Sequence, residues 1–281
     1  MKAVLLNLSA WTMLPIMDGF AKFLSFYLPV IQIVWARYFF TVVIVLPVMF
    51  IYFRKKIKLS KKPKLQFLRG ILLFSANILF FYSISIISLS KALTLAFIAP
   101  LIVTSFSPFF LKEKVGISRW VAVIFGFLGC LIVIRPGFLE TNMATFAALG
   151  TGLMYGFYII VTRKLSTSDN SLLTLLFTGI VGAIIASCIV PFSWVTPTYN
   201  QWFILILIGL FASIGHLFLI MSLKLADASK LAPFGYFEII PNIIIGYYFF
   251  GDLPDFYHFI GLIIIILSGV YIFRKQFYIQ L

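Results

Sequence analysis

Few side chains capable of chemistry occur inside the long apolar stretches of this 281-residue sequence. Glu238, Arg37 and His216 are ionisable, and Asn77 offers a neutral donor and acceptor. An ionisable group surrounded by hydrocarbon costs roughly 2.5–3.5 kcal/mol on insertion scales, so we expect each of these side chains to face a cavity or a partner. Groups of this kind suit the recognition of a polar solute or the movement of a proton.

Glu238 is the strongest candidate for a functional acid. It lies eight residues into an apolar stretch, a depth of about 12 Å at the rise of an α-helix. A carboxyl group at that depth suits proton coupling or the sensing of a cation. The alternative is a protonated carboxyl group that hydrogen-bonds a neighbouring helix.

Arg37 and His216 are expected to support this site. Arg37 is suited to an anionic group of a substrate, but we favour a structural pairing with Asp18. A single histidine in a membrane more often joins two helices than relays protons. Asn77 and Asn242 are suited either to ligand contacts or to interhelical bonds, and we favour the interhelical bond for Asn242.

Aromatic side chains supply a candidate wall for a binding site. They make up 18% of the chain, and most of the 33 Phe residues must face lipid or pack against other helices. Rings near mid-depth can stack on a planar or cationic ligand. The rings expected there are Trp11, Tyr82, Phe97, Tyr155 and Tyr236.

The composition shows what must position these side chains. The chain is 62% apolar and 11% charged, whereas a soluble domain is roughly 45–50% apolar and about 25% charged. These figures exclude soluble, disordered, collagen-like and disulfide-scaffold classes. A membrane-spanning helix needs about 20 apolar residues, and continuous runs without alternation argue against a barrel. We expect an all-α membrane protein with spans at 3–21, 30–53, 67–87, 91–111, 118–134, 144–162, 171–191, 201–222, 230–250 and 257–273.

The positions of the basic residues predict the orientation. The chain carries a net charge of +14, and 18 of its 22 Lys and Arg residues fall on one side of the ten expected spans. The densest run, 54–64, lies on that side, and the other side receives only Lys22, Lys91 and Arg135. Because cytoplasmic loops are rich in Lys and Arg, both termini are predicted to be cytoplasmic. This distribution accounts for the charge without a nucleic-acid partner.

Weak self-similarity predicts two five-span repeats, 1–139 and 140–281. At an offset of 139 residues, Ser90-Lys91-Ala92 matches Ser229-Lys230-Leu231. An odd number of spans inverts the second copy, and inverted repeats place a solute site at broken helices near the midplane. Pro100 and Pro241 lie near the middle of the fourth and ninth spans, where they are expected to interrupt the helices.

Catalytic and cofactor motifs are missing from the sequence. It has no HExxH, GxSxG, GxxxxGK or CxxC pattern, and only two histidines and eight acids. We therefore predict no enzyme, no cofactor and no metal site. Cys130 and Cys188 lie within expected spans and are expected to be reduced and buried. The first apolar run is expected to be a span and not a cleaved leader.

Short segments throughout the chain resemble the ten-helix, EamA-type members of the drug/metabolite transporter superfamily. They are Trp11 to Lys22, Phe67-Leu68-Arg69-Gly70, Tyr82 to Ala92, Ala99-Pro100-Leu101, Leu111 to Lys114, Trp120, Gly126-Phe127, Ala226 to Pro233, Tyr236-Phe237-Glu238 and Gly251-Asp252. The resemblance implies inverted five-helix repeats, a central cavity between the first, third, fourth, sixth, eighth and ninth spans, and alternating access. The segment Asp227 to Asp255 and Arg69-Gly70 look most like S-adenosylmethionine uptake carriers, although Asp252 replaces the usual Glu.

These observations predict a secondary transporter of a small organic metabolite in a bacterial inner membrane, coupled to protons or to exchange. S-adenosylmethionine or a nucleoside-like solute is one candidate substrate class, and export of amino acids or drugs is another. A pore or a non-transporting membrane subunit is the alternative outside this class. The expected partners are the small-molecule substrate, the lipid bilayer and a second copy of the chain.

Overall fold

The computed structural model describes residues 1–53, 60–134, 142–251 and 256–278, and these residues form helices joined by short connections. The loop residues Arg54, Lys55, Lys56 and Lys58, together with Arg135, Asp252 and Asp255, lie outside the described residues. The helices are α1 (Lys2–Leu24), α2 (Val30–Phe53), α3 (Pro63–Ile86), α4 (Leu89–Ala96), α5 (Ile98–Leu111), α6 (Ile117–Ile134), α7 (Met143–Ser166), α8 (Ser171–Ile189), η2 (Val190–Ser193), α9 (Tyr199–Leu225), α10 (Ala228–Leu231), η3 (Ala232–Glu238), α11 (Ile239–Phe250) and α12 (Phe256–Tyr278).

These helices correspond to the ten expected spans. Seven segments of the described chain are long and apolar enough to cross a membrane, with α4 and α5 together counted as one. The other three spans are α6 and α12, which contain the shorter apolar segments Ile117–Gly129 and Phe259–Ser268, and the broken stretch from α10 to α11. The expectation of an all-α membrane fold is confirmed.

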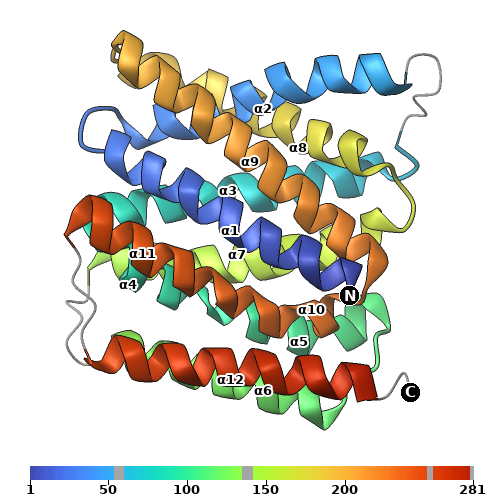
Figure 1. Ribbon diagram of the computed structural model, residues 1–281. Coiled ribbons are helices and arrows are strands. Elements are labelled where there is room, and N and C mark those ends of the chain that lie inside the picture. The colour runs from blue at the N-terminus through green and yellow to red at the C-terminus, as the bar shows by residue number, and fades with distance from the viewer. Residues whose placement is uncertain (54–59, 135–141, 252–255, 279–281) are drawn as a thin grey trace.

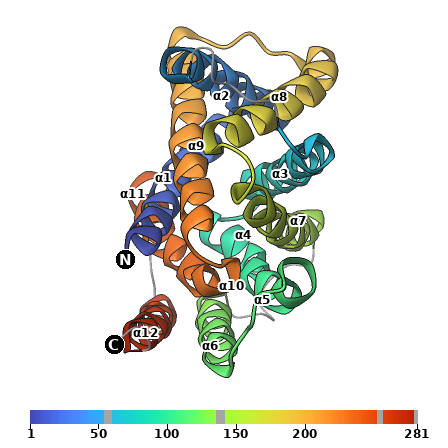
Figure 2. The same ribbon diagram turned by 90° about the vertical axis from the view of Figure 1, so that its right-hand side faces the viewer.

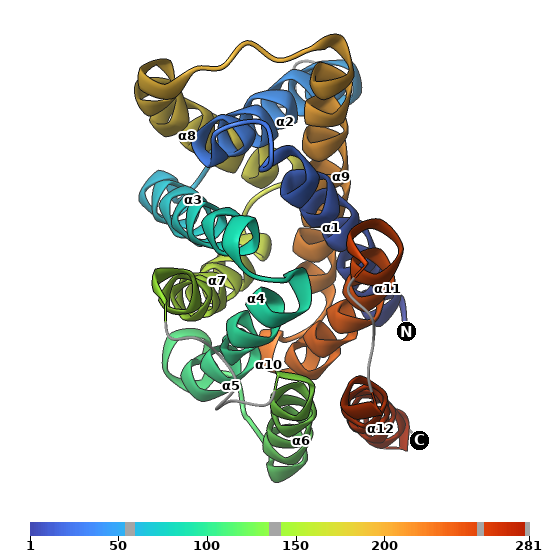
Figure 3. The same cartoon turned by 90° about the vertical axis from the view of Figure 1, so that its left-hand side faces the viewer.

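The packing pairs helices in a pattern that relates the two halves. Helix α1 packs on α9, and its counterpart α7 packs on α3. Helices α2 and α8 pack on each other, as do α6 and α12. The end-on views show the α2–α8 pair at one side of the bundle and the α6–α12 pair at the other (Figures 2 and 3). The start of α1 and the end of α12 lie at the same end of the bundle (Figure 1), as an even number of spans requires.

The fourth and ninth spans are both broken, at matching places. In the fourth span, Phe97 separates α4 from α5, and in the ninth a 3-10 segment ends at Glu238, directly before α11. Pro100 and Pro241 are each the third residue of the helix that follows. Proline is tolerated in a first helical turn because the amide there has no intrahelical acceptor, so both prolines mark the start of a new helix segment.

A close helix contact supports the break in the fourth span. A β-carbon on Gly152 of α7 would lie 2.5 Å from the backbone oxygen of Ala96. One on Gly156 would lie 2.7 Å from the side chain of Ile102. The small residues at this spacing therefore let α7 approach the backbone where α4 ends.

The expectation of buried cysteines is wrong for Cys188. Its side chain is exposed and free, because it lies on a face of α8 turned away from the bundle. The side chain of Cys130 lies outside the described residues.

Candidate functional site

A central cavity lies between the two halves of the bundle. It is lined by α1, α3, the α4–α5 span, α7, α9 and the α10–η3 segment, the six spans that the resemblance implied. The cavity has a volume of about 90 Å³. Its lining residues are Asn7, Trp11, Leu14, Met17, Asp18, Ala76, Asn77, Phe80, Leu93, Ala96, Phe97, Ala99, Pro100, Val103, Thr151, Tyr155, Ile159, His216, Leu219, Leu223, Ala228, Leu231, Ala232, Gly235 and Glu238.

Two carboxyl groups face this cavity. Asp18 comes from α1 and Glu238 from the residue that precedes α11; they are 4% and 8% exposed. Their charges lie close enough to interact. Neither carboxyl group forms a hydrogen bond or ion pair with another side chain that the structure describes. A buried carboxylate without a partner is costly, so both groups are available to a ligand or a proton.

Aromatic rings form one wall of the cavity. Trp11 and Tyr155 meet edge to face, with their centroids 6.2 Å apart. The indole N–H of Trp11 donates to Oδ1 of Asn7 over 2.7 Å, which fixes the orientation of the ring. The hydroxyl of Tyr155 is buried and has no hydrogen-bond partner in the described chain. Phe97, at the break of the fourth span, completes the wall.

A buried chain of hydrogen bonds lies behind the wall. Arg37 donates to Nε2 of His216 over 2.6 Å, so the neutral imidazole carries its proton on Nδ1. That nitrogen lies 3.0 Å from the hydroxyl of Tyr158, which also accepts from Arg69 over 2.6 Å. Arg69 further donates to Thr162, Thr178 and the backbone oxygen of Thr174, and Arg37 contacts the sulfur of Met17.

Arg37 therefore does not pair with Asp18, contrary to the favoured expectation. Its guanidinium contacts His216 and Met17 and forms no ion pair with the carboxyl group, although the two charges still interact. Neither Arg37 nor Arg69 lines the cavity. His216 does line it and also joins α2 to α7, so it combines a cavity position with a structural bond.

The two asparagines have different surroundings. Asn77 lines the cavity, and its amide nitrogen donates to the hydroxyl of Tyr38 and to the backbone oxygen of Leu73. Asn242 lies outside the lining, and its nitrogen donates to the backbone oxygen of Glu238. The bond of Asn242 stays within one broken span and does not join two helices.

Three further candidates lie outside the cavity. Tyr82 is 40% exposed on α3, because that part of the helix faces away from the bundle. Tyr236 is fully buried, but its ring packs against Gly126 of α6 and its hydroxyl donates to the backbone oxygen of Val123. Pro241 follows the break without lining the cavity, whereas its counterpart Pro100 does line it.

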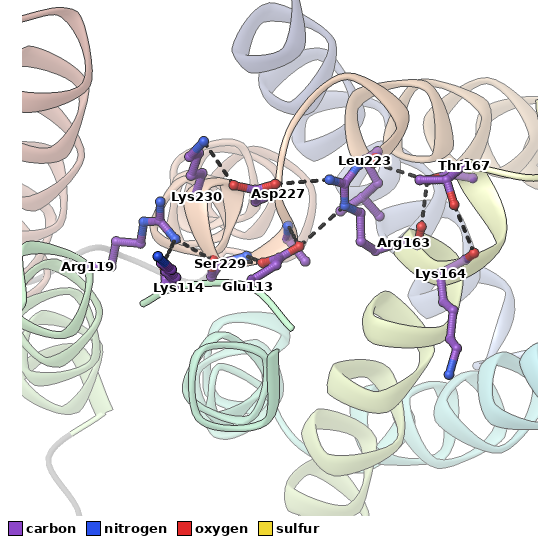
Figure 4. Close-up of polar contacts among 12 residues, drawn as sticks. Glu113, Lys114, Arg119, Arg163, Lys164, Thr167, Leu223, Asp227, Ser229 and Lys230 are labelled. Atoms are coloured by element: carbon purple, nitrogen blue, oxygen red, sulfur yellow. Dashed lines mark hydrogen bonds and ion pairs between the residues drawn. The ribbon is translucent and has the colours of Figure 1, made fainter. Parts of the chain in front are cut away.

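A polar cluster lies beside the cavity, near the start of α10 (Figure 4). The carboxylate of Glu113, which follows α5, accepts from the backbone nitrogens of Ala228 and Ser229 over 3.0 Å each. Arg163 of α7 lies 3.3 Å from Glu113, 2.9 Å from Asp227 and 2.7 Å from the backbone oxygen of Leu223. Leu223 and Ala228 line the cavity, so the cluster lies directly behind its floor.

Further bonds extend this cluster. Arg119 donates to the hydroxyl of Ser229 over 2.7 Å, and Lys230 pairs with Asp227 over 2.9 Å. Burial raises the pKa of Asp227, but its bond to Lys230 and the charges of Lys230, Arg163 and Arg119 outweigh that effect, so the pKa lies below its ordinary value. Asp227 is therefore ionised at neutral pH.

A second anchored carboxylate is that of Asp169. Asp169 accepts from the side chains of Ser60 and Gln66 and from the backbone nitrogen of Lys61. Burial raises the pKa of Asp169, but these hydrogen bonds outweigh it and hold the pKa below its ordinary value. The carboxylate ties the start of α3 to the connection between α7 and α8.

Sequence reasoning did not assign Asp18 to the cavity, nor Asn7, Tyr158 and the Glu113–Arg163–Asp227 cluster to any role. Of these residues, only the role of Asp18 could have been predicted from the sequence, because an acid inside an apolar stretch needs a partner or a cavity. The cluster joins residues more than 100 positions apart, which no local pattern reveals. In the described parts of the chain, no group of three His, Cys, Asp or Glu side chains is placed to hold a metal ion.

Comparison with known families agrees with this architecture. The model of the EamA-like transporter family matches residues 1–135 and again 142–274. The chain belongs to the EamA-like transporter family. The two matches cover the two sets of five spans described above.

Named relatives include several transporters. The chain is 26% identical to the S-adenosylmethionine uptake transporter of Rickettsia conorii, over 92% of this chain and 88% of that protein. It is 28% identical to the riboflavin transporter of Vibrio cholerae, over 59% of this chain and 56% of that protein. A solved crystal structure shares the fold, with a TM-score of 0.79 and 16% identity, over 96% of this chain and 95% of that one.

Proposed function

We propose that this protein is a secondary active transporter that moves a small organic solute through the central cavity by alternating access. The observation that carries the proposal is that one cavity receives side chains from both repeats and includes both helix breaks. Inverted repeats of this kind move against each other around a site at their interface. The repeats are taken as residues 1–139 and 140–281.

In this proposal the Glu113–Arg163–Asp227 cluster is the closed gate at the lysine-rich, cytoplasmic end. It joins α5 and α7 to the start of α10, so the solute can leave at that end only when these bonds break. A cluster of ion pairs and hydrogen bonds has two discrete arrangements, bonded and open, as a gate requires. Both termini and this cluster would face the cytoplasm of a bacterial cell, and the bundle would lie in the inner membrane.

Glu238 would be the acid that recognises the solute or couples its movement to protons. Its carboxyl group faces the cavity without a partner among the described side chains, so it can exchange a proton for a positively charged group. Trp11, Phe97 and Tyr155 would stack on a planar part of the solute. These features favour S-adenosylmethionine or another nucleoside-like solute over a simple amino acid, and the named relatives include carriers of ring-containing solutes.

Exchange across reconstituted vesicles tests the proposal. Purified protein is placed in liposomes loaded with unlabelled S-adenosylmethionine, adenosine, riboflavin or an amino acid, and entry of the same labelled solute is followed. A carrier gives saturable entry that a loaded internal solute accelerates. Non-saturable entry with ionic current would instead indicate a pore, and no entry of any solute would indicate a non-transporting subunit.

A further inference from the structure

The charges of the cavity lining are of one sign. Asp18 and Glu238 are its acids, and among the described lining residues there is neither Lys nor Arg. Arg37 and Arg69 lie behind the wall, where His216, Tyr158 and three threonines occupy their donors. The two guanidinium groups therefore lie outside the lining, although the charge of Arg37 still acts on Asp18, and both lining acids face inward.

Neither acid has a hydrogen-bond or ion-pair partner in the part of the chain that the structure describes, although each is more than nine-tenths buried. A carboxylate in such surroundings attracts a cation more strongly than it would in water, because the local dielectric is low. The two carboxyl groups come from different repeats, Asp18 from α1 and Glu238 from the break before α11. A cation between them would offset part of this negative charge and contact both halves.

The aromatic wall favours a ligand that carries a flat group. Trp11 is held by Asn7, and Tyr155 meets its ring edge to face, so a flat group can lie against the pair. The buried hydroxyl of Tyr155, which has no partner in the described chain, offers a hydrogen bond to the same ligand. Aromatic faces also attract cations, so the wall and the acids favour the same kind of molecule.

We propose that the cavity selects an organic cation that carries a planar ring, with Asp18 and Glu238 together binding its positive charge. This inference rests on the proposed transport function and adds the substrate class to it. It also assigns Asp18 as a binding residue from the first repeat, opposite Glu238 from the second.

Matched pairs of probes test the charge requirement. S-adenosylhomocysteine is S-adenosylmethionine without the methyl group that makes the sulfur positive, and nicotinamide is the neutral counterpart of 1-methylnicotinamide. Competition of each probe with saturable exchange in vesicles gives a ratio of affinities that does not depend on the fraction of folded protein. The charged member of at least one pair should bind about tenfold or more tightly, because only its positive centre is attracted by the carboxylates, and that attraction is strong where the local dielectric is low.

Two amide variants assign the preference to residues. Asp18→Asn and Glu238→Gln should each lower the ratio, and the double variant should bring it close to one. Asp169→Asn makes the same chemical change at an acid outside the cavity and should leave the ratio unchanged.

The outcomes separate this inference from the transport proposal. Equal affinity for charged and neutral partners, or preference for the neutral ones, overturns the cation inference while exchange itself stands. A preference that survives in both variants overturns the assignment to Asp18 and Glu238. Absence of saturable exchange for every solute tested overturns the transport proposal, and the inference falls with it.

Discussion

Asp18 and Glu238 face one cavity from the two repeats, and neither carboxyl group has a bonded partner among the described side chains. Arg37, whose charge acts on Asp18, is itself hydrogen-bonded to His216. The cavity is thus shared between the two halves, which would move against each other in the proposed alternating access. Any solute that neutralises both acids also links the movement of the repeats to its own binding.

The Glu113–Arg163–Asp227 cluster should control how easily molecules enter the cavity from the cytoplasmic end. In a chain with Cys130 and Cys188 replaced by Ser, Leu231→Cys places a thiol on the cavity wall beside the cluster. Arg163→Met removes bonds worth about 1–3 kcal/mol, so labelling of this thiol by an impermeant maleimide should become about tenfold faster.

Lys164→Met is the matched control for that experiment. It removes a positive charge from the next position of α7, where the exposed side chain forms none of the cluster's bonds. Labelling in this variant should match that of the parent chain. Equal acceleration in both variants would show that bulk charge, and not the cluster, limits access.

The hydroxyl of Tyr158 should stabilise the fold, whereas that of Tyr155 should not. Tyr158→Phe leaves a nitrogen of Arg69 and Nδ1 of His216 without their acceptor, which should cost about 1–3 kcal/mol. Tyr155→Phe removes a buried hydroxyl that has no partner in the described chain. Thermal unfolding in detergent should therefore show a lower Tm for the first variant only, and a lower Tm for both would contradict the network.

The contact of α7 with the end of α4 should tolerate no β-carbon. Gly152→Ala would place a methyl group 2.5 Å from the backbone oxygen of Ala96, and overpacking of this kind costs about 1–3 kcal/mol. Gly116→Ala is a matched control, since nothing lies within 4 Å of its added carbon. The free energy of unfolding should fall in the first variant and stay unchanged in the second. An equal response would show that the close approach is not required.

The stabilising contribution of Asp227 in the Glu113–Arg163–Asp227 cluster should not depend on pH across the physiological range. The pKa of Asp227 in the folded protein lies below the ordinary value of 3.8, so its stabilising contribution is complete above that value and is lost as the pH falls through the lower folded pKa. The difference in Tm between the parent chain and Asp227→Asn should be constant between about pH 5 and pH 8. If the difference in Tm already becomes smaller near neutral pH, a group of the cluster other than Asp227 must change its protonation there.

Much of the architecture could be predicted from the sequence, because lipid allows only long apolar helices and basic loops mark one side. The paired breaks were also accessible, since Pro100 and Pro241 mark matching positions. The direction in which a side chain points could not be predicted from the sequence. Tyr236 and Phe97 both lie near a break, but Gly126, 110 positions before Tyr236, leaves room for the tyrosine ring to turn toward α6. Likewise, Asp18 forms no ion pair with Arg37. The guanidinium of Arg37 donates a hydrogen bond to His216 on α9 instead.

The central claim is that solute passes through the cavity. The most direct test is to fill the cavity by a substitution at Gly235 and to measure exchange. A β-carbon there meets Pro100 at 3.7 Å and the ring of Trp11 at 3.8 Å, which is ordinary contact, so Gly235→Ala should exchange labelled solute normally. Gly235→Phe should place a ring between these residues and abolish exchange while the protein still unfolds at a similar temperature. Val43→Phe, on an exposed face of α2, should behave like the parent chain. Exchange by Gly235→Phe at the parent rate and affinity would contradict the claim that solute passes through this cavity.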